Sequence, residues 1–170
     1  VIDTKNPSWR SELKKQISGK DRTSLSRVKM SELPPDVRNK NYEEVNRGLT
    51  LTEAMQEAKR CLDCPNPGCV QGCPVGIDIP SFIKRIEVGQ ILDAAKVLKE
   101  TSALPAVCGR VCPQEKQCEA LCIHKKMKKE PVAIGYLERF AADFERESGQ
   151  ISVPEVKQRN GIKIAVAGSG

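Results

Sequence analysis

The chain has few aromatic residues and only one histidine. Its 170 residues include one Trp, two Tyr and three Phe, or 4% of the total, so aromatic anchors for a core are scarce. We therefore expect something other than aromatic side chains to fill the centre. A cysteine nucleophile is disfavoured because His124 is the only imidazole that could act as its base. On sequence alone, His124 is interpreted as an exposed loop residue.

Long apolar runs and long blocks of like charge are also missing. No apolar stretch is long enough to span a membrane, and no signal-peptide pattern is present, so we expect a soluble, cytoplasmic protein without a membrane partner. The net charge is +6, but the charges are interspersed and no aromatics alternate with them, which disfavours nucleic-acid binding. The densest basic run, Lys125 to Lys129, is predicted to be a solvated loop, with a docking patch as the alternative.

All eight cysteines lie in two short runs, Cys61 to Cys73 and Cys108 to Cys122. These thiols could bind zinc. Zinc ribbons, however, pair two Cys-x2-Cys knuckles, and here only Cys61 and Cys64 form one. Disulfides are a second possibility, which a reducing cytoplasm disfavours. The runs have the spacings Cys-x2-Cys-x4-Cys-x3-Cys-Pro and Cys-x3-Cys-Pro-x4-Cys-x3-Cys. Bacterial ferredoxins have a similar pattern, so two iron-sulfur clusters with ligands crossed between the runs fit best.

The periodicity predicts a mainly helical domain between residues 50 and 150. A capping box at Thr50 and Glu53 opens a helix that ends near Arg60. Further helices are expected from Ile79 to near Gly89, from Ile91 to Glu100, and from Pro131 to about Glu147. Residues 1–49 are polar and are interpreted as an extended, partly helical arm.

The final residues change period. Residues 161–170 begin as a β-type run and end in the Gly-x-Gly of Gly168 and Gly170, the pattern that opens a dinucleotide-binding βαβ unit. We therefore expect residues 151–170 to be a linker followed by the first strand and glycine turn of an FAD/NAD(P)-binding domain. On this interpretation, the chain is the front part of a longer polypeptide.

Several motifs in order resemble the N-terminal iron-sulfur domain of the NADPH-dependent glutamate synthase small subunit. They include Arg60-Cys-Leu-Asp-Cys, Gly72-Cys-Pro-Val, Leu104-Pro-Ala-Val-Cys-Gly-Arg-Val-Cys-Pro and Gly135-Tyr-Leu-Glu-Arg. Similar domains occur in the large subunit of NADH-dependent ferredoxin:NADP oxidoreductase and in dihydropyrimidine dehydrogenase. The resemblance covers residues 27–147 and implies an α-helical ferredoxin domain with two 4Fe-4S clusters.

The resemblance also implies a set of cluster ligands. The first cluster is assigned four thiols: Cys61, Cys64, Cys69 and Cys122. The second is assigned three thiols and a carboxylate: Cys73, Cys112, Cys118 and Glu138. The relatives have Gln or Glu at the position of Glu138. On the residues alone, Glu138 is better interpreted as a solvent-facing helix carboxylate, and only the resemblance reverses this. The alternative assignment makes Cys108 the eighth ligand in place of Glu138.

The function implied is electron transfer inside an NAD(P)H-dependent oxidoreductase. Hydride carries two electrons and a cluster accepts one, so a flavin in the rest of the polypeptide would divide the pair and the clusters would pass single electrons to a larger partner subunit. This segment alone is not expected to be catalytic. The non-enzymatic alternative is a zinc-stapled docking module. We expect the clusters to be buried among a set of apolar residues: Val70, Val75, Ile77, Val107, Val111 and Leu121.

Overall fold

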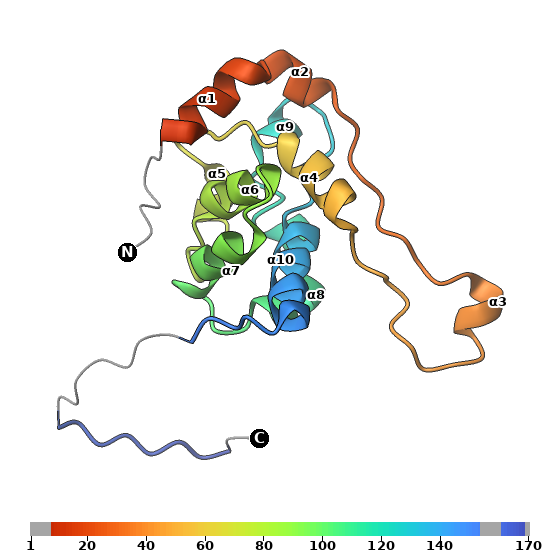
Figure 1. Cartoon of the computed structure of the whole chain (residues 1–170), viewed down its shortest axis with the longest axis vertical. Coiled ribbons are helices and arrows are strands. Elements are labelled where there is room, and N and C mark those ends of the chain that lie inside the picture. The colour runs from red at the N-terminus through yellow and green to blue at the C-terminus, as the bar shows by residue number, and fades with distance from the viewer. Residues whose placement is uncertain (1–7, 154–160, 169–170) are drawn as a thin grey trace.

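A computed structural model describes residues 8–153 and 161–168, and the described chain is helical (Figure 1). No strand is assigned in these two ranges, where the only β pairing is an isolated bridge between Glu32 and Asn46. The prediction of a mainly helical domain is confirmed.

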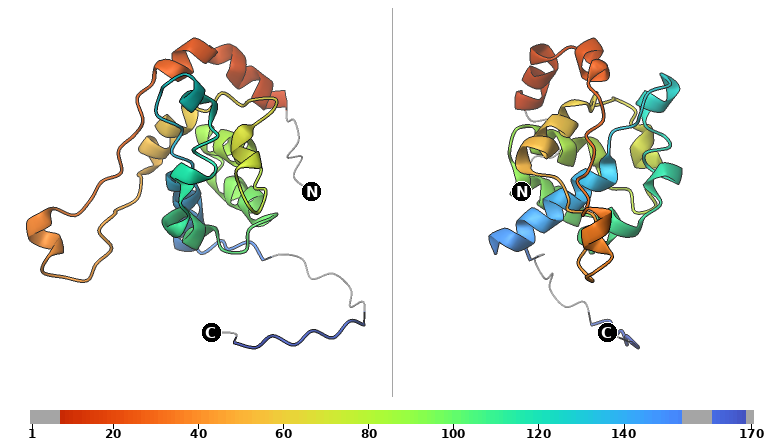
Figure 2. Two further views of the ribbon diagram at one scale, coloured as in Figure 1. Left: turned by 180° about the vertical axis from the view of Figure 1, so that it is seen from behind. Right: turned by 90° about the vertical axis from the view of Figure 1, so that its right-hand side faces the viewer.

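Four helices form the body of the domain: α4 (Leu51–Lys59), α6 (Ile79–Glu87), α7 (Ile91–Lys99) and α10 (Ile134–Ser148). Helix α10 packs against the other three, and α6 packs against α4 and α7 (Figures 1 and 2). The predicted capping box is present: the Glu53 amide donates to Thr50 Oγ1 at 3.3 Å, and the Thr50 amide donates to Glu53 Oε2 at 2.8 Å. All four predicted helices form close to their expected bounds.

The core of this body is aliphatic. Its buried members include Ile79, Ile83, Ile86, Leu98, Ile134 and Leu137, with Phe82 as the one fully enclosed aromatic. The scarcity of aromatics led us to expect another kind of filling. Among the described residues this filling is mainly aliphatic, because α6, α7 and α10 each present a stripe of branched side chains that pack together with few large rings.

The N-terminal region is anchored to the body rather than free. Helices α1 (Ser8–Gln16) and α2 (Gly19–Ser24) lie across α4 and α6 (Figure 1). Arg22 is buried, and its guanidinium donates to both Glu87 carboxylate oxygens, at 2.9 and 3.0 Å. Arg10 pairs with Asp63, with Nε 2.9 Å from Oδ2. These ion pairs join the polar segment to the helices that follow it.

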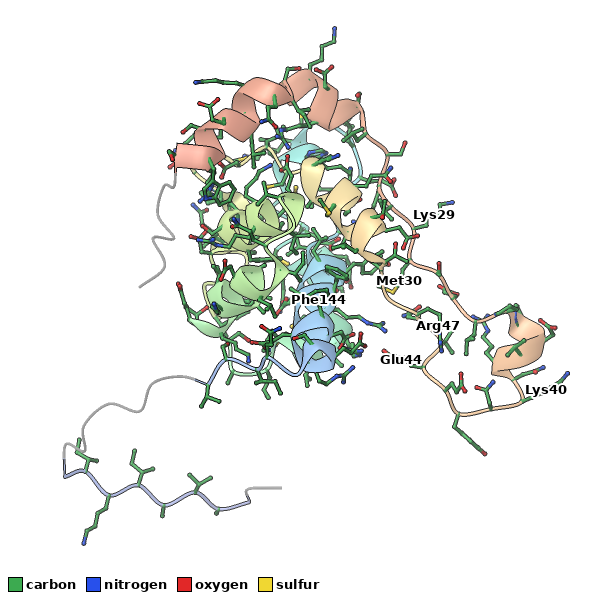
Figure 3. All side chains as sticks on the ribbon, viewed as in Figure 1. Lys29, Met30, Lys40, Glu44, Arg47 and Phe144 are labelled. Atoms are coloured by element: carbon green, nitrogen blue, oxygen red, sulfur yellow. The ribbon has the colours of Figure 1, made fainter. Side chains whose placement is uncertain are left out.

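Residues 25–49 leave the body and return to it, with α3 (Pro35–Arg38) near the far end of the excursion (Figures 1 and 2). In Figure 3, Lys40 lies at this far end, whereas Met30 and Glu44 lie near the base. At the base, Glu44 pairs with Arg110 at 2.8 Å and with Arg139 at 3.2 Å. This part of the predicted arm is the extended one.

The cysteine runs are folded into short helices: α5 (Gly68–Gln71), α8 (Pro105–Val111), the 3-10 helix η1 (Gln114–Lys116) and α9 (Ile123–Lys126). The sequence prediction did not include them. Helix α8 packs closely on α10 because Gly109 has no side chain: a Cβ placed there would lie 2.6 Å from the Arg139 amide nitrogen. Gly109 thus brings the C-terminal end of α8 next to the α10 turn that carries Glu138.

Substitution of Gly109 by alanine is expected to separate the two helices. The added methyl group would meet backbone atoms of Arg139 at 2.6 and 2.8 Å, and backbone cannot rotate away as a side chain can. Such overpacking destabilises by about 1–3 kcal/mol. We expect a lower unfolding free energy in denaturant titrations and weaker iron retention by the neighbouring cysteines. Gly19→Ala is the matched control, because the nearest atom to its added methyl group would be Leu62 Cδ2 at 3.9 Å. An equal effect of both variants would contradict the steric argument.

Residues 161–168 are described, but they form no strand. Ile162, Ile164 and Val166 are all exposed, at spacing two, as on one face of a β segment. Gly168 has a φ of 80°, which suits a glycine turn, whereas Gly170 lies outside the described residues. The strand and dinucleotide-binding turn therefore stay predictions. Across the described ranges, no helix has the length and apolar character needed to cross a membrane.

Candidate metal centres

The four thiols predicted for the first cluster line one cavity. Cys61 follows α4, Cys69 lies in α5, and Cys122 immediately precedes α9, yet these residues and Cys64 share a cavity of about 530 Å³. Its walls are largely apolar and include Ile79, Ile83, Leu121, Val132 and Ile134. The fold therefore collects this predicted ligand set from both cysteine runs.

Two glycines allow the runs to approach each other. A Cβ at Gly68 would lie 2.6 Å from the Leu121 carbonyl oxygen, and one at Gly72 would lie 2.7 Å from the Gln117 carbonyl oxygen. One face of α5 therefore rests directly on the backbone of residues 117–121. This contact places Cys69 near Cys122, and it places Cys73, which follows α5, on the side of Cys118.

The electrostatics of the first group disfavour free thiolates. Burial raises the pKa of Cys61, Cys64 and Cys69, and the neighbouring Cys122 raises all three further. Against this, backbone amides of Asp63 and Val70 donate to the thiols of Cys61 and Cys69. A cationic metal centre would supply what the group lacks, because bound metal stabilises the deprotonated thiol.

The second predicted set also comes together, at the junction of α8 and α10. The thiol of Cys112 interacts electrostatically with Cys73 and with Glu138, and so does that of Cys118. Burial raises the pKa of Cys118 to about 12. Cys73 and Glu138 thus each lie near both Cys112 and Cys118, and the assignment of these four residues to one cluster stays a prediction.

Glu138 is buried without a partner for one of its oxygens. It is 6% exposed, and Oε1 has no hydrogen-bond partner among the described residues. Burial raises the pKa of its carboxyl group to about 7. Other buried glutamates are paired: Glu57 with Arg60, Glu87 with Arg22, and Glu119 with Arg27. A buried carboxylate oxygen that no donor meets is suited to a metal ligand.

Cys108 lies at the edge of the second group. Its half-buried thiol is 3.9 Å from Ser102 Oγ and contacts the thiol of Cys112. The spacing of four residues on α8 accounts for this contact with Cys112. There are two candidates for the eighth ligand. The carboxylate of Glu138 lies close enough to raise the pKa of both Cys112 and Cys118, whereas Cys108 is a main influence on Cys112 but not on Cys118.

The donor sets fit iron-sulfur cubes better than single ions or disulfides. All eight cysteines are free. Within the described residues, no three or more His, Cys, Asp or Glu side chains are close enough to hold one metal ion, as a tetrahedral zinc site requires. A cube of four irons holds its ligands farther apart than one ion does, so the four thiols that line the first cavity are compatible with it.

Two expectations about the surroundings are wrong. His124 is fully buried rather than exposed, and its Nε2 lies 3.1 Å from the Arg60 carbonyl oxygen. It is enclosed because α9 folds back on the end of α4. Of the six apolar residues expected to bury the clusters, only Ile77 is fully buried. Val70 is partly buried, and the remainder are 48–70% exposed: Val75, Val107, Val111 and Leu121. Of these four, Leu121 still lines the cavity of the first site, whose other apolar walls come mainly from α6 and residues 132–134.

The basic run from Lys125 to Lys129 is exposed, as predicted for a solvated loop. It overlaps α9, and the Lys129 ammonium donates to the Thr23 carbonyl oxygen at 2.6 Å. The run therefore helps hold α2 against the body.

Comparisons with known proteins agree with this geometry. The family described as dihydropyrimidine dehydrogenase domain II, 4Fe-4S cluster, matches residues 38–150. The glutamate synthase [NADPH] small chain of Escherichia coli is 37% identical over 147 residues, which is 86% of this chain and 31% of that protein. A homolog of the NAD-dependent dihydropyrimidine dehydrogenase subunit PreT from Salmonella typhi is 41% identical over 132 residues, 76% of this chain and 31% of that protein. The chain thus spans about a third of the length of these relatives.

Proposed function

The chain belongs to the family of 4Fe-4S domains described as dihydropyrimidine dehydrogenase domain II, and from this premise we propose that it relays single electrons between a flavin and a partner redox centre. The proposed relay has two 4Fe-4S clusters. Cys61, Cys64, Cys69 and Cys122 would hold the first, and Cys73, Cys112, Cys118 and Glu138 the second. The domain itself would comprise residues 50–150, preceded by the N-terminal arm 1–49.

The observation that carries this proposal is the gathering of each ligand set from separate parts of the chain. Four thiols surround one cavity of about 530 Å³. In the second set, the thiols of Cys112 and Cys118 lie near the buried carboxylate of Glu138, one oxygen of which has no hydrogen-bond partner among the described residues. Eight ligands in two groups are the number that two cubes require.

When bound, such clusters supply one-electron oxidation and reduction. The chain's own residues would exclude water from the clusters and donate hydrogen bonds to the ligand sulfurs. Ile79, Ile83 and Ile134 exclude water from the first site. Backbone amides of Asp63, Val70 and Glu119 donate to the thiols of Cys61, Cys69 and Cys118. Hydrogen bonds to ligand sulfurs and the surrounding polarity are the levers by which proteins set the reduction potential.

The rest of the parent protein is inferred from the relatives. We propose that residues 151–170 lead into an FAD- and NAD(P)H-binding domain whose glycine turn includes Gly168 and Gly170, and that the complete protein works with a larger catalytic or redox subunit. A glutamate synthase small subunit is our first choice of parent, since that match covers 86% of this chain. A PreT-like dihydropyrimidine dehydrogenase subunit is the second, on its 41% identity. The ferredoxin:NADP oxidoreductase alternative stays a prediction.

Metal analysis with reduction tests the proposal. Anaerobically purified protein is expected to contain about eight iron and eight acid-labile sulfide per chain and to be reduced reversibly by dithionite. Cys122→Ser should disturb the first site and Cys118→Ser the second, each lowering iron by about half. The two variants serve as each other's control, since their electron paramagnetic resonance spectra should lose different signals. Zinc without sulfide would instead support the docking module, and clusters that dithionite cannot reduce would make their role structural.

A further inference from the structure

A buried group of charges lies directly behind the first cluster site. Lys84 of α6 is 2% exposed, and its ammonium donates to the Cys61 carbonyl oxygen at 2.5 Å and to Glu87 Oε2 at 2.6 Å. Glu87 also accepts from Arg22 of α2, at 2.9 and 3.0 Å. We call Lys84, Glu87 and Arg22 the charge triad. It contains two cations and one carboxylate, so its formal charge is +1.

Stability alone gives little reason for such a group. Removing three charges from water is expensive, and well-packed apolar residues of similar volume are often as stabilising or more so. Lys84 and Glu87 are buried on the same helix as Ile79, Ile83 and Ile86, which belong to the apolar core. One neutral hydrogen-bond donor would be enough to hold the Cys61 carbonyl group in place. The triad supplies a net charge as well.

The excess charge acts on the first site. The ammonium of Lys84 is buried and lies 2.5 Å from the carbonyl oxygen of Cys61, so a positive charge stands beside a proposed ligand of this site. Another buried cation nearby, Arg60, is balanced by Glu57 at 2.6 Å. Asp63 is paired with Arg10, and with Lys14, whose side chain is half exposed and so largely screened by solvent.

We propose that the charge triad raises the reduction potential of the cluster held by Cys61, Cys64, Cys69 and Cys122, with Lys84 as its tuning residue. Reduction adds one negative charge to that site, and a fixed positive charge in a low-dielectric surrounding stabilises the reduced form more than the oxidised form. This inference rests on the proposed function. Arg22 belongs to α2, so the net positive charge of the triad depends on α2 being docked against the body. The inference therefore links the potential of the first cluster to the N-terminal helices.

Two substitutions in the triad distinguish an effect of charge from an effect of structure, because a charge effect would shift the reduction potential in opposite directions. Lys84→Met removes one positive charge and should shift the first cluster to a more negative potential. Glu87→Gln removes the negative charge and should shift it to a more positive one. Lys84→Arg keeps the charge and should leave the potential near that of the unaltered protein. Potentials are read from redox titrations monitored by electron paramagnetic resonance, with the second cluster as the internal reference.

An exposed pair provides the matched control. Lys96 on α7 pairs with Asp93 at 3.0 Å, and its side chain is about half exposed, so Lys96→Met should shift neither cluster. Shifts of Lys84→Met and Glu87→Gln in the same direction, or no shift in either, would overturn the inference. If Lys84→Met loses its iron, Glu87→Gln decides alone: a positive shift supports the inference and a zero or negative shift overturns it. Failure of the proposed function would look different, since the unaltered protein would then contain no reducible cluster.

Discussion

Replacement of Glu138 by alanine is expected to lower the iron content from about eight to about four atoms per chain, whereas Cys108→Ala should leave about eight. The reason is the unpartnered Oε1 of Glu138, which is buried beside Cys112 and Cys118. Cys108 contacts Cys112 from the edge of the group and has Ser102 as another neighbour. Iron and sulfide analysis of both variants, purified anaerobically, is the measurement.

Two further observations make the Glu138 result specific. Glu138→Gln keeps an oxygen ligand, so it should retain the second cluster. Glu138→Ala should not unfold the helical body, because a buried carboxylate without a partner opposes folding of the metal-free chain. The first cluster should therefore remain in the alanine variant. If Cys108→Ala loses iron and Glu138→Ala does not, the thiol is the eighth ligand and the carboxylate has another role.

Removal of iron and sulfide is expected to abolish cooperative thermal unfolding and to lower the helical circular dichroism. Structural metal sites contribute about 10–16 kcal/mol in small zinc domains, and the net stability of a whole domain is only about 5–15 kcal/mol. Without metal, the thiols of Cys61, Cys64, Cys69 and Cys122 would surround a cavity of about 530 Å³. Water would have to fill that cavity or the walls would have to collapse.

The structure also indicates where the loss should begin. Helices α6, α7 and α10 share an aliphatic core and should keep part of their helix content. Residues 61–74 and 108–122 contain only short helices and should lose protection first. Hydrogen exchange of the loaded and metal-free protein, read by segment, measures this order, with α7 as the internal comparison. A melting curve that metal removal does not change would refute the prediction.

The sequence predicted the long helices well and their surroundings poorly. The capping box at Thr50 and the apolar periodicity of residues 79–86 are local signals, so α4 and α6 form where expected. Burial of His124 and exposure of Val111 depend on how α9 and α8 dock, which no local pattern encodes. Arg22 and Lys84 look like surface charges in the sequence. For Lys84, the one sequence feature that could have indicated an ion pair is Glu87, three residues later on the same helix.

The candidate site followed a similar division. Cysteine spacing indicated two clusters, but it could not divide eight thiols between them. That division came from the resemblance, and the cavity around Cys61 and Cys122 now supports it. Glu138 could not be found from spacing at all, because a glutamate in an amphipathic helix normally faces solvent. Its burial depends on Gly109, which lets α8 approach α10.

The close contact of α5 with residues 117–121 has a consequence for biosynthesis. Because the two runs complete each other's ligand sets, neither proposed site can close on the growing chain until much of the domain has left the ribosome. On the proposed assignment, Cys61, Cys64 and Cys69 would wait for Cys122, and Cys73 would wait for Glu138. Delivery of both proposed clusters would then follow the translation of α10.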